Sequence, residues 1–204
     1  MVSNNSGDGS LTREEDYAAR LVGLQTVTWK EKLRLFDPYG WQIKLICKGN
    51  VLEVGSGIGR NLNALKGRSL GVDHNETAVA FANERGLKSL TSEQFFSQCI
   101  SKTKKFDTIL LSHVLEHIDQ ETQNQIFRQY LPCLKPKARV VIICPQEVGF
   151  DSDPTHIRWV DEDILRETLT SLGCTDIKVN SFPFPRKFGK TFIYNQFVAI
   201  AQLS

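Results

Sequence analysis

The segment VLEVGSGIGRNLNAL, residues 51–65, constrains the fold of this chain more than any other stretch. An apolar run that predicts a buried strand leads into a glycine-rich turn, and the turn leads into a helical pattern. The turn has glycine at alternate positions: Gly55, Gly57 and Gly59. A turn of this kind between a strand and a helix brings backbone N–H groups and the positive end of a helix dipole close to a bound ligand.

The ribose of such a ligand is expected to lie beside Asp73. A second apolar run, residues 69–72, leads directly into this aspartate. A carboxylate at the tip of the second strand of an α/β sheet is placed to accept hydrogen bonds from the two ribose hydroxyls. The glycine turn and Asp73 together predict a cofactor that contains adenosine.

Two features of the turn decide which adenosine cofactor is expected. A dinucleotide-binding turn has its third glycine where this chain has Arg60. Glu53 lies inside the strand, just before the first glycine. Its carboxylate would repel a pyrophosphate but would attract an ammonium group, directly or through a water molecule. These features favour S-adenosylmethionine, which carries an amino-acid group and a sulfonium, over NAD.

The same residues carry a resemblance to a known family. E-V-G-S-G-I-G, residues 53–59, resembles the first motif of the class I S-adenosylmethionine-dependent methyltransferases, (D/E)-x-G-x-G-x-G. FDTILLSHVLEHID, residues 106–119, resembles the fourth strand of these enzymes and the V-L-E-H sequence that many of them carry after it. With its P-Q-E and F-P-F-P-R segments, the chain is similar over residues 29–200 to small bacterial members whose acceptor is unassigned.

The resemblance implies which residues contact the cofactor. The first and fourth strands flank the point where the strand order of a doubly wound sheet reverses, and ligands bind beyond their carboxyl ends. After the third strand, related enzymes often have an aspartate for the adenine amino group, and here Ser92, Glu93 or the backbone would replace it. The cofactor-binding residues that we expect are Glu53, Gly55, Ser56, Gly57, Gly59, Asp73, His74, Ser92, Ser112 and His113.

The expected fold is α/β: a Rossmann-like, doubly wound sheet of seven strands with an antiparallel C-terminal strand pair and a helical N-terminal extension. Residues 1–10 are rich in Ser, Asn and Gly and predict a disordered tail. The extension covers residues 11–48, with a break expected at Asp37-Pro38. Residues 49–204 are expected to form the Rossmann-like methyltransferase domain, and the whole chain one structural domain.

Two histidines are candidates for the chemistry on the acceptor side. His117 follows the fourth strand, and His156 lies in the loop DSDPTHIRW after the fifth. The ordinary pKa of histidine, near about 6.5, suits a general base that takes a proton from a hydroxyl, an amine or an acidic carbon. The alternatives are that His117 orders its loop and that His156 is hydrogen-bonded by Asp151 or Asp153.

A metal site is not expected. His113, Glu116 and His117 form H-x-x-E-H, which is also the motif of the inverted zinc peptidases. In those enzymes the motif lies within a long helix, so that both histidines share one face. Here the preceding residues predict a strand and Asp119 predicts the start of the next helix, which leaves no helix to present the pair.

Composition and charge favour a small-molecule acceptor. A net charge of +2 over 204 residues, with no run rich in Lys and Arg, gives no electrostatic case for nucleic acid. No N-P-P-Y or D-P-P-Y tetrapeptide follows the fourth strand, which disfavours methylation of a base. No apolar run approaches the roughly 18–20 residues that span a bilayer. Five widely spaced cysteines, with no signal peptide and no C-x-x-C pair, predict reduced thiols in a cytoplasmic protein.

The predicted function is transfer of a methyl group from S-adenosylmethionine to a small molecule, by in-line attack on the sulfonium methyl. Two alternatives remain open at this point. A non-catalytic S-adenosylmethionine-binding protein would bind the cofactor without transfer, and an NAD-dependent oxidoreductase would prefer NADH. Arg60 and the C-terminal strand pair count against the oxidoreductase. The oligomeric state is not predicted.

Overall fold

The fold comes from a computed structural model that describes residues 37–98 and 105–204. The predicted tail at residues 1–10, and the predicted N-terminal extension up to residue 36, lie outside the described residues. Within these residues, no helix is long and apolar enough to cross a membrane.

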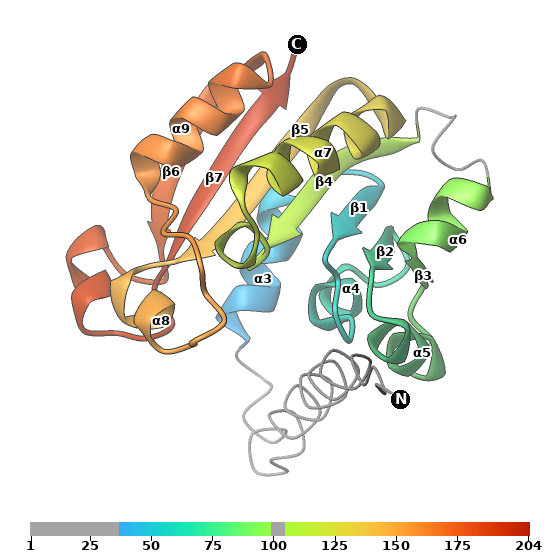
Figure 1. Ribbon diagram of the computed structural model, residues 1–204, viewed down its shortest axis with the longest axis horizontal. Coiled ribbons are helices and arrows are strands. Elements are labelled where there is room, and N and C mark those ends of the chain that lie inside the picture. Colours follow the sequence, from blue (N-terminus) through green and yellow to red (C-terminus); the bar gives the residue numbers. More distant parts are fainter. Residues whose placement is uncertain (1–36, 99–104) are drawn as a thin grey trace, which may run out of the picture.

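The described strands form one sheet in the order β3-β2-β1-β4-β5-β7-β6 (Figure 1). They are β1 (Val51–Val54), β2 (Ser69–Asp73), β3 (Ser89–Thr91), β4 (Phe106–Ser112), β5 (Leu134–Pro145), β6 (Cys174–Phe182) and β7 (Gln196–Leu203). Neighbours from β3 to β5 pair in parallel, whereas β7 runs antiparallel to both β5 and β6. The predicted seven-stranded, doubly wound sheet with antiparallel C-terminal strands is confirmed.

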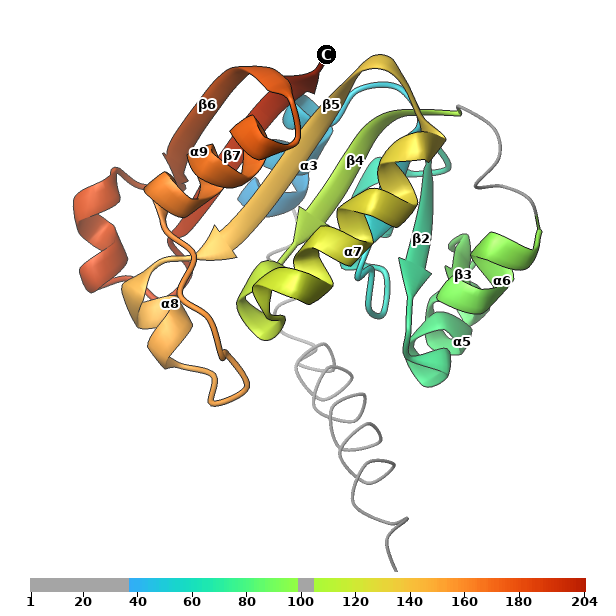
Figure 2. The ribbon, with the colours of Figure 1, turned by 45° about the horizontal axis from the view of Figure 1, so that its top comes forward.

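Helices cover both faces of this sheet. They are α3 (Pro38–Ile46), α4 (Arg60–Leu65), α5 (Glu76–Glu84), α6 (Ser92–Ser97), α7 (Gln120–Tyr130), α8 (Glu147–Asp151) and α9 (Glu162–Ser171), with short 3-10 turns η2 (Leu115–His117), η3 (Leu131–Cys133) and η4 (Arg186–Lys190). Figure 2 shows α7 and α9 on one face and α3 on the other. The layering places β1 and β4 in the centre, covered on both sides.

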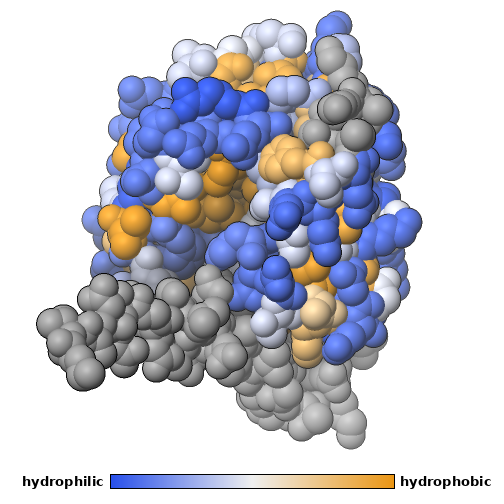
Figure 3. Space-filling view, turned by 45° about the vertical axis from the view of Figure 1, so that its right-hand side comes forward, coloured by the Kyte–Doolittle hydropathy of each residue, from blue (hydrophilic) through white to orange (hydrophobic). Residues whose placement is uncertain are grey.

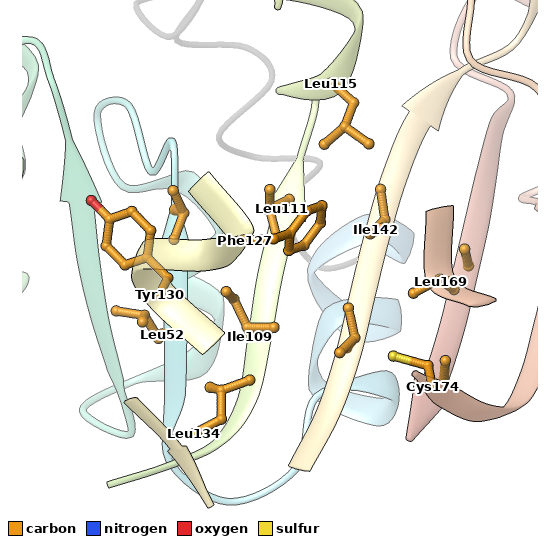
Figure 4. Close-up of a cluster of buried hydrophobic side chains, with 14 of the residues drawn as sticks. Leu52, Ile109, Leu111, Leu115, Phe127, Tyr130, Leu134, Ile142, Leu169 and Cys174 are labelled. Atoms are coloured by element: carbon orange, nitrogen blue, oxygen red, sulfur yellow. The ribbon is translucent and has the colours of Figure 1, made fainter. Parts of the chain in front are cut away.

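The hydrophobic core follows from this layering. On one face, side chains from α6, α7 and α9 pack on the sheet, and Figure 4 shows Phe127 of α7 beside Leu111 of β4. On the other face, Ile43 of α3 and Leu65 of α4 pack on Val51. Strands covered on both faces are buried at nearly every position, which is why β1 and β4 are mainly apolar in the sequence.

Asp37-Pro38 begins helix α3, and the residues before it, where the preceding predicted helix would end, lie outside the described residues. The Asp37 side chain accepts a hydrogen bond from Gly40 N at 3.0 Å, and Pro38 occupies the first helical position of α3. Proline is tolerated there because its missing N–H has no partner within a helix in any case. Asp161 caps α9 in the same way, since its side chain accepts a hydrogen bond from Ile164 N at 3.0 Å.

Because β1, β2, β4 and β5 are parallel, their carboxyl ends lie at one edge of the sheet, together with η2 and α8 (Figure 1). We call this the carboxyl edge. The order of the chain reverses there, since β2 and β3 lie on one side of β1 whereas β4 and β5 lie on the other. On the face shown in Figure 3, hydrophobic residues gather in a hollow bordered by hydrophilic ones. Ligands of open α/β sheets bind at such a reversal point.

A matched pair of leucines tests the layering. Leu111 of β4 is fully buried, whereas Leu45 of α3 is 57% exposed. Leu111→Ala should lower the free energy of unfolding by about 2–5 kcal/mol, because it leaves a cavity between α7 and the sheet. Leu45→Ala should change it by less than about 0.5 kcal/mol. Urea unfolding measures both, and equal losses would contradict the described packing.

Candidate active site at the carboxyl edge

The glycine turn after β1 is folded back onto the end of β2. Gly55 N and Ser56 N donate to Val72 O at 2.8 and 3.2 Å. Gly55 has a φ of +75°, and a Cβ added to it would overlap Val114, which follows β4. A side chain is therefore excluded at Gly55 both by the backbone conformation and by the close approach of the β4 loop. Gly59 has a φ of +82° and begins α4.

Gly57 has the opposite environment to Gly55. Its φ is +50°, but a Cβ added there would meet nothing within 4 Å. Its N–H points to Asp73, whose Oδ2 accepts the hydrogen bond at 2.6 Å. Ser56 is buried behind the turn, with its Oγ 3.4 Å from Ser89 Oγ. The surface of the turn at Gly57 is thus open, and the backbone there is held by the hydrogen bond to Asp73.

Asp73 is the last residue of β2 and is 7% exposed. Its Oδ1 accepts from Asn75 N at 2.9 Å, while Oδ2 holds the Gly57 N–H. A carboxylate has about four lone-pair sites, so each oxygen retains capacity for a further donor. His74 is exposed, with Nδ1 3.5 Å from Asp73 Oδ1. Sequence reasoning foresaw the place of Asp73 but not that it closes the glycine turn.

Glu53 is a buried acid in the central strand. Its Oε1 accepts from Asn61 Nδ2 of α4 at 2.7 Å, and among the described residues its Oε2 has no hydrogen-bond partner. Burial raises the pKa of Glu53 to about 8, an effect that the Asn61 hydrogen bond opposes only in part. The carboxyl group is consequently neutral at pH 7 in the protein as it stands.

Ser92 and Ser112 end the neighbouring strands. Ser92 opens α6, where its Oγ accepts from Tyr130 OH at 3.3 Å. Thr91, immediately before it, caps α6 through Gln94 N at 3.1 Å. Ser112 is the last residue of β4 and is half-buried.

His113 is held by two side chains from opposite sides. Its Nδ1 is 3.1 Å from Glu116 Oε1, and its Nε2 is 3.2 Å from Gln196 Oε1. Gln196 Nε2 in turn donates to Gln42 Oε1 at 2.9 Å. Surrounding protein lowers the pKa of His113, but the hydrogen bond and negative charge of Glu116 raise it by more, so the net shift is upward. With both ring nitrogens engaged, His113 is suited to positioning Glu116.

Gln42 and Gln196 were not predicted to belong to the site. Gln42 lies on α3 and Gln196 opens β7, and both are buried. The only sequence signal for Gln196 was a polar residue at the start of an apolar strand.

The side chains of His117 and His156, the two candidates for acceptor chemistry, lie next to each other. Their ring centroids are 4.7 Å apart. The meeting is fixed by the backbone, because Ile157 N and Arg158 N both donate to Glu116 O, at 2.9 and 3.2 Å. The surrounding protein and His156 lower the pKa of His117. For His156, Nδ1 lies 2.6 Å from Phe150 O, and the backbone N–H donates to Asp153 O at 3.1 Å.

A shallow pocket between α7 and α9, lined in part by Phe127 and Leu172, lies away from the carboxyl edge. Its lining contains neither a carboxylate nor a histidine. We therefore place the functional site at the carboxyl edge, where the titratable groups converge.

The strand order, with β7 antiparallel between β5 and β6, and the glycine turn between two acidic residues at the carboxyl edge define a class I methyltransferase fold. A family model described as Methyltransferase domain matches residues 30–179. The chain belongs to this family. It is an enzyme that uses S-adenosylmethionine. The family match is to methyltransferases and not to the NAD-dependent oxidoreductases considered from the sequence.

Solved structures share the fold at low sequence identity. A SAM-dependent methyltransferase from Archaeoglobus fulgidus is 22% identical, with a TM-score of 0.62 over 93% of this chain and 94% of that one. A TehB-like SAM-dependent methyltransferase from Corynebacterium glutamicum is 19% identical, with a TM-score of 0.63 over 96% and 100%. A possible histamine N-methyltransferase from Thermotoga maritima is 16% identical, with a TM-score of 0.62 over 81% and 87%. No curated protein matches the sequence.

The contrast between Gly55 and Gly57 yields a stability prediction. Alanine at either position is strained by its positive φ, at a cost of about 1–2 kcal/mol. Gly55→Ala should cost more than Gly57→Ala, because only at Gly55 does the new Cβ overlap Val114. Urea unfolding of both variants measures the difference. An equal loss would mean that the β4 loop does not approach the turn as described.

Glu53 makes the stability of the cofactor-free protein depend on pH. Its pKa in the folded state, about 8, lies above the ordinary 4.5 that we expect in the unfolded chain. Between these values the folded state holds a proton that the unfolded state lacks, so the contribution of Glu53 to stability decreases as pH rises from 4.5 to 8.

Glu53→Gln removes this titration. The free energy of unfolding of the variant minus that of the wild type should therefore increase between pH 5 and pH 8, by at most about 1.4 kcal/mol per pH unit. Urea unfolding across this range measures it, and parallel profiles for the two proteins would contradict a neutral buried Glu53.

Proposed function

We propose that the chain transfers the methyl group of S-adenosylmethionine to a small molecule that enters beside His117 and His156. The observation that carries this proposal is the convergence at the carboxyl edge. The glycine turn and the two acids of β1 and β2 lie on one side of the reversal point, and the two histidines lie on the other. Cofactor and acceptor would thus approach each other across the ends of β1 and β4.

The cofactor-side residues fit this group chemically. The unpartnered Oε2 of Glu53 is suited to the cofactor ammonium, directly or through water, and the remaining lone pairs of Asp73 to the ribose hydroxyls. The open face at Gly57 leaves room for the methionine end above the turn. The other expected contacts, Gly55, Ser56, Gly59, His74, Ser92, Ser112 and His113, are part of the same proposal. In it, Gly55, Ser56, Gly59 and His113 act by shaping the turn and the loop.

The chain's own contribution to the reaction is chiefly positioning. The bound cofactor supplies a sulfonium methyl that is already activated for displacement. Holding the acceptor in line with that methyl can supply up to about 7–11 kcal/mol in favourable cases. A base is needed only for an acceptor that must lose a proton. His117 or His156 would then be the catalytic residue, because the Nδ1 of each faces a backbone carbonyl and leaves Nε2 able to accept a proton.

The proposed acceptor is a small molecule, and we expect neither nucleic acid nor membrane as a partner. The net charge of +2 supports this. The structural neighbour from Thermotoga maritima also supports a small-molecule acceptor, because it is described as a possible histamine N-methyltransferase and histamine is a small amine. We also propose a cytoplasmic location, which is supported by the buried thiols of Cys47, Cys144 and Cys174.

Calorimetric titration with S-adenosylhomocysteine tests the cofactor assignment. The wild type should bind it in preference to NADH, and Asp73→Ala should weaken binding by about 10–100-fold, because hydrogen bonds from the ribose to a carboxylate are lost. Asp107→Ala is the matched control. Asp107 also accepts from a backbone N–H, that of Asn50 at 2.8 Å, and it pairs with Lys135 at the opposite edge of the sheet.

Asp107→Ala should therefore lose stability without losing affinity for S-adenosylhomocysteine. Undiminished binding by Asp73→Ala would contradict the assignment of the ribose to Asp73. A preference for NADH would contradict the cofactor itself.

A further inference from the structure

We propose that Glu116, His117 and His156 bind a divalent transition-metal cation on the acceptor side of the carboxyl edge. This inference deepens the proposed function and rests on it for the place of the acceptor, but the cation site itself stands on separate residues. It differs from the zinc-peptidase motif considered in the sequence, because the second histidine is His156 of a distant loop and not His113.

The three side chains offer their donor atoms to one point. One ring nitrogen of each histidine and one carboxylate oxygen of Glu116 all lie within 4.8 Å of one another. Around a cation with bonds of roughly 2.0–2.2 Å, neighbouring donor atoms lie roughly 3–3.5 Å apart. Binding a cation therefore requires donor atoms of the cluster to approach one another by up to roughly 1.5 Å.

Both imidazoles are already oriented as metal ligands are. His156 Nδ1 is 2.6 Å from Phe150 O, and His117 Nδ1 is 3.3 Å from Thr155 O and 3.2 Å from Thr155 Oγ1. An Nδ1–H that donates to a backbone carbonyl fixes the ring and the tautomer, which leaves the Nε2 lone pair for a metal. Two such lone pairs beside a carboxylate repel one another, and a cation removes that repulsion.

Glu116 provides the independent observation that indicates a ligand. Its side chain is fully buried, and Oε2 has no hydrogen-bond partner among the described residues, whereas Oε1 is held by His113. Leaving a buried carboxylate oxygen unpaired is costly, and a bound cation satisfies it.

The prediction from sequence that no metal binds here was based on His113 and His117, whereas the cluster proposed here pairs His117 with His156. Residues 115–117 form only a single 3-10 turn, so His113 and His117 do not share a helix face. The loop after β5 instead brings His156 to His117, pinned by the two backbone hydrogen bonds to Glu116 O. In this proposal His113 is not a ligand. It contacts Glu116 and Gln196 and positions the Glu116 carboxylate.

The donor set indicates the class of cation and of acceptor. Two imidazoles and one carboxylate suit Zn²⁺, Co²⁺, Mn²⁺ or Fe²⁺, whereas Mg²⁺ and Ca²⁺ prefer oxygen donors throughout. Three protein ligands leave at least one coordination position open. A hydroxyl of the acceptor that occupied this position would have a lowered pKa and would need no histidine as base. The acceptor class that fits is therefore an alcohol or phenol.

Metal titration of the full chain tests the site without an acceptor. After chelator treatment and dialysis, Zn²⁺ is titrated by calorimetry and Co²⁺ by visible absorption. We expect one cation per chain and a Co²⁺ spectrum without a thiolate charge-transfer band. His117→Ala, His156→Ala and Glu116→Gln should each weaken binding by more than the roughly 10–100-fold typical of losing a residue behind the ligands. Asp107→Ala, which removes a carboxylate at the opposite edge of the sheet, should leave the affinity for Zn²⁺ unchanged.

S-adenosylhomocysteine binding separates this proposal from the proposed function. Variants that lose Zn²⁺ but still bind S-adenosylhomocysteine are folded and support the site. No stoichiometric Zn²⁺ binding by the wild type, or equal binding by the wild type and the two histidine variants, would overturn it even if the cofactor binds. A wild type that binds Zn²⁺ but not S-adenosylhomocysteine would leave the cation site standing and refute the proposed function.

Discussion

The buried carboxyl group of Glu53 is the feature on which the rest of the carboxyl edge depends. It lies in β1, the strand covered on both faces, and one of its oxygens is anchored to α4 by Asn61. An apolar residue would pack more favourably at this depth, because burial of an ionisable group with an unpaired oxygen is costly. The cost becomes intelligible if the second oxygen meets a positively charged group when the cofactor is bound. The neutrality of Glu53 in the free protein follows from the same arrangement.

The two halves of the edge are built in different ways. On the cofactor side, the turn after β1 is held by Val72 O and Asp73, both from β2, so that two adjacent strands define one surface. On the acceptor side, Glu116 organises the group: its carbonyl holds the loop that carries His156, and its carboxylate meets His113. Val114 lies against Gly55 and connects the halves. Under the proposed function, a change in the loop that carries His156 would alter the acceptor site while the cofactor surface stays intact.

Sequence reasoning was strongest where structure is local. The strand, turn and second strand from Val51 to Asp73 were predicted because apolar runs and glycines act over a few residues. Asp37-Pro38 marks the start of α3, because an aspartate cap and a proline in the first helical position both suit the beginning of a helix. Contacts between residues far apart in the sequence could not be predicted, because no pattern within either segment indicates its distant partner. His113 meets Gln196 at a separation of 83 residues, and Gln196 meets Gln42 at 154.

The most direct test of the account is the proton balance of cofactor binding. If Glu53 is neutral at pH 7 and ionises against the cofactor ammonium, binding of S-adenosylhomocysteine should release close to one proton, about 0.9 for a free pKa near 8. Calorimetry in buffers of different ionisation enthalpy measures this number, and Glu53→Gln should reduce it to about zero. The same binding enthalpy in every buffer, or a proton release that persists in Glu53→Gln, would contradict the role assigned to Glu53.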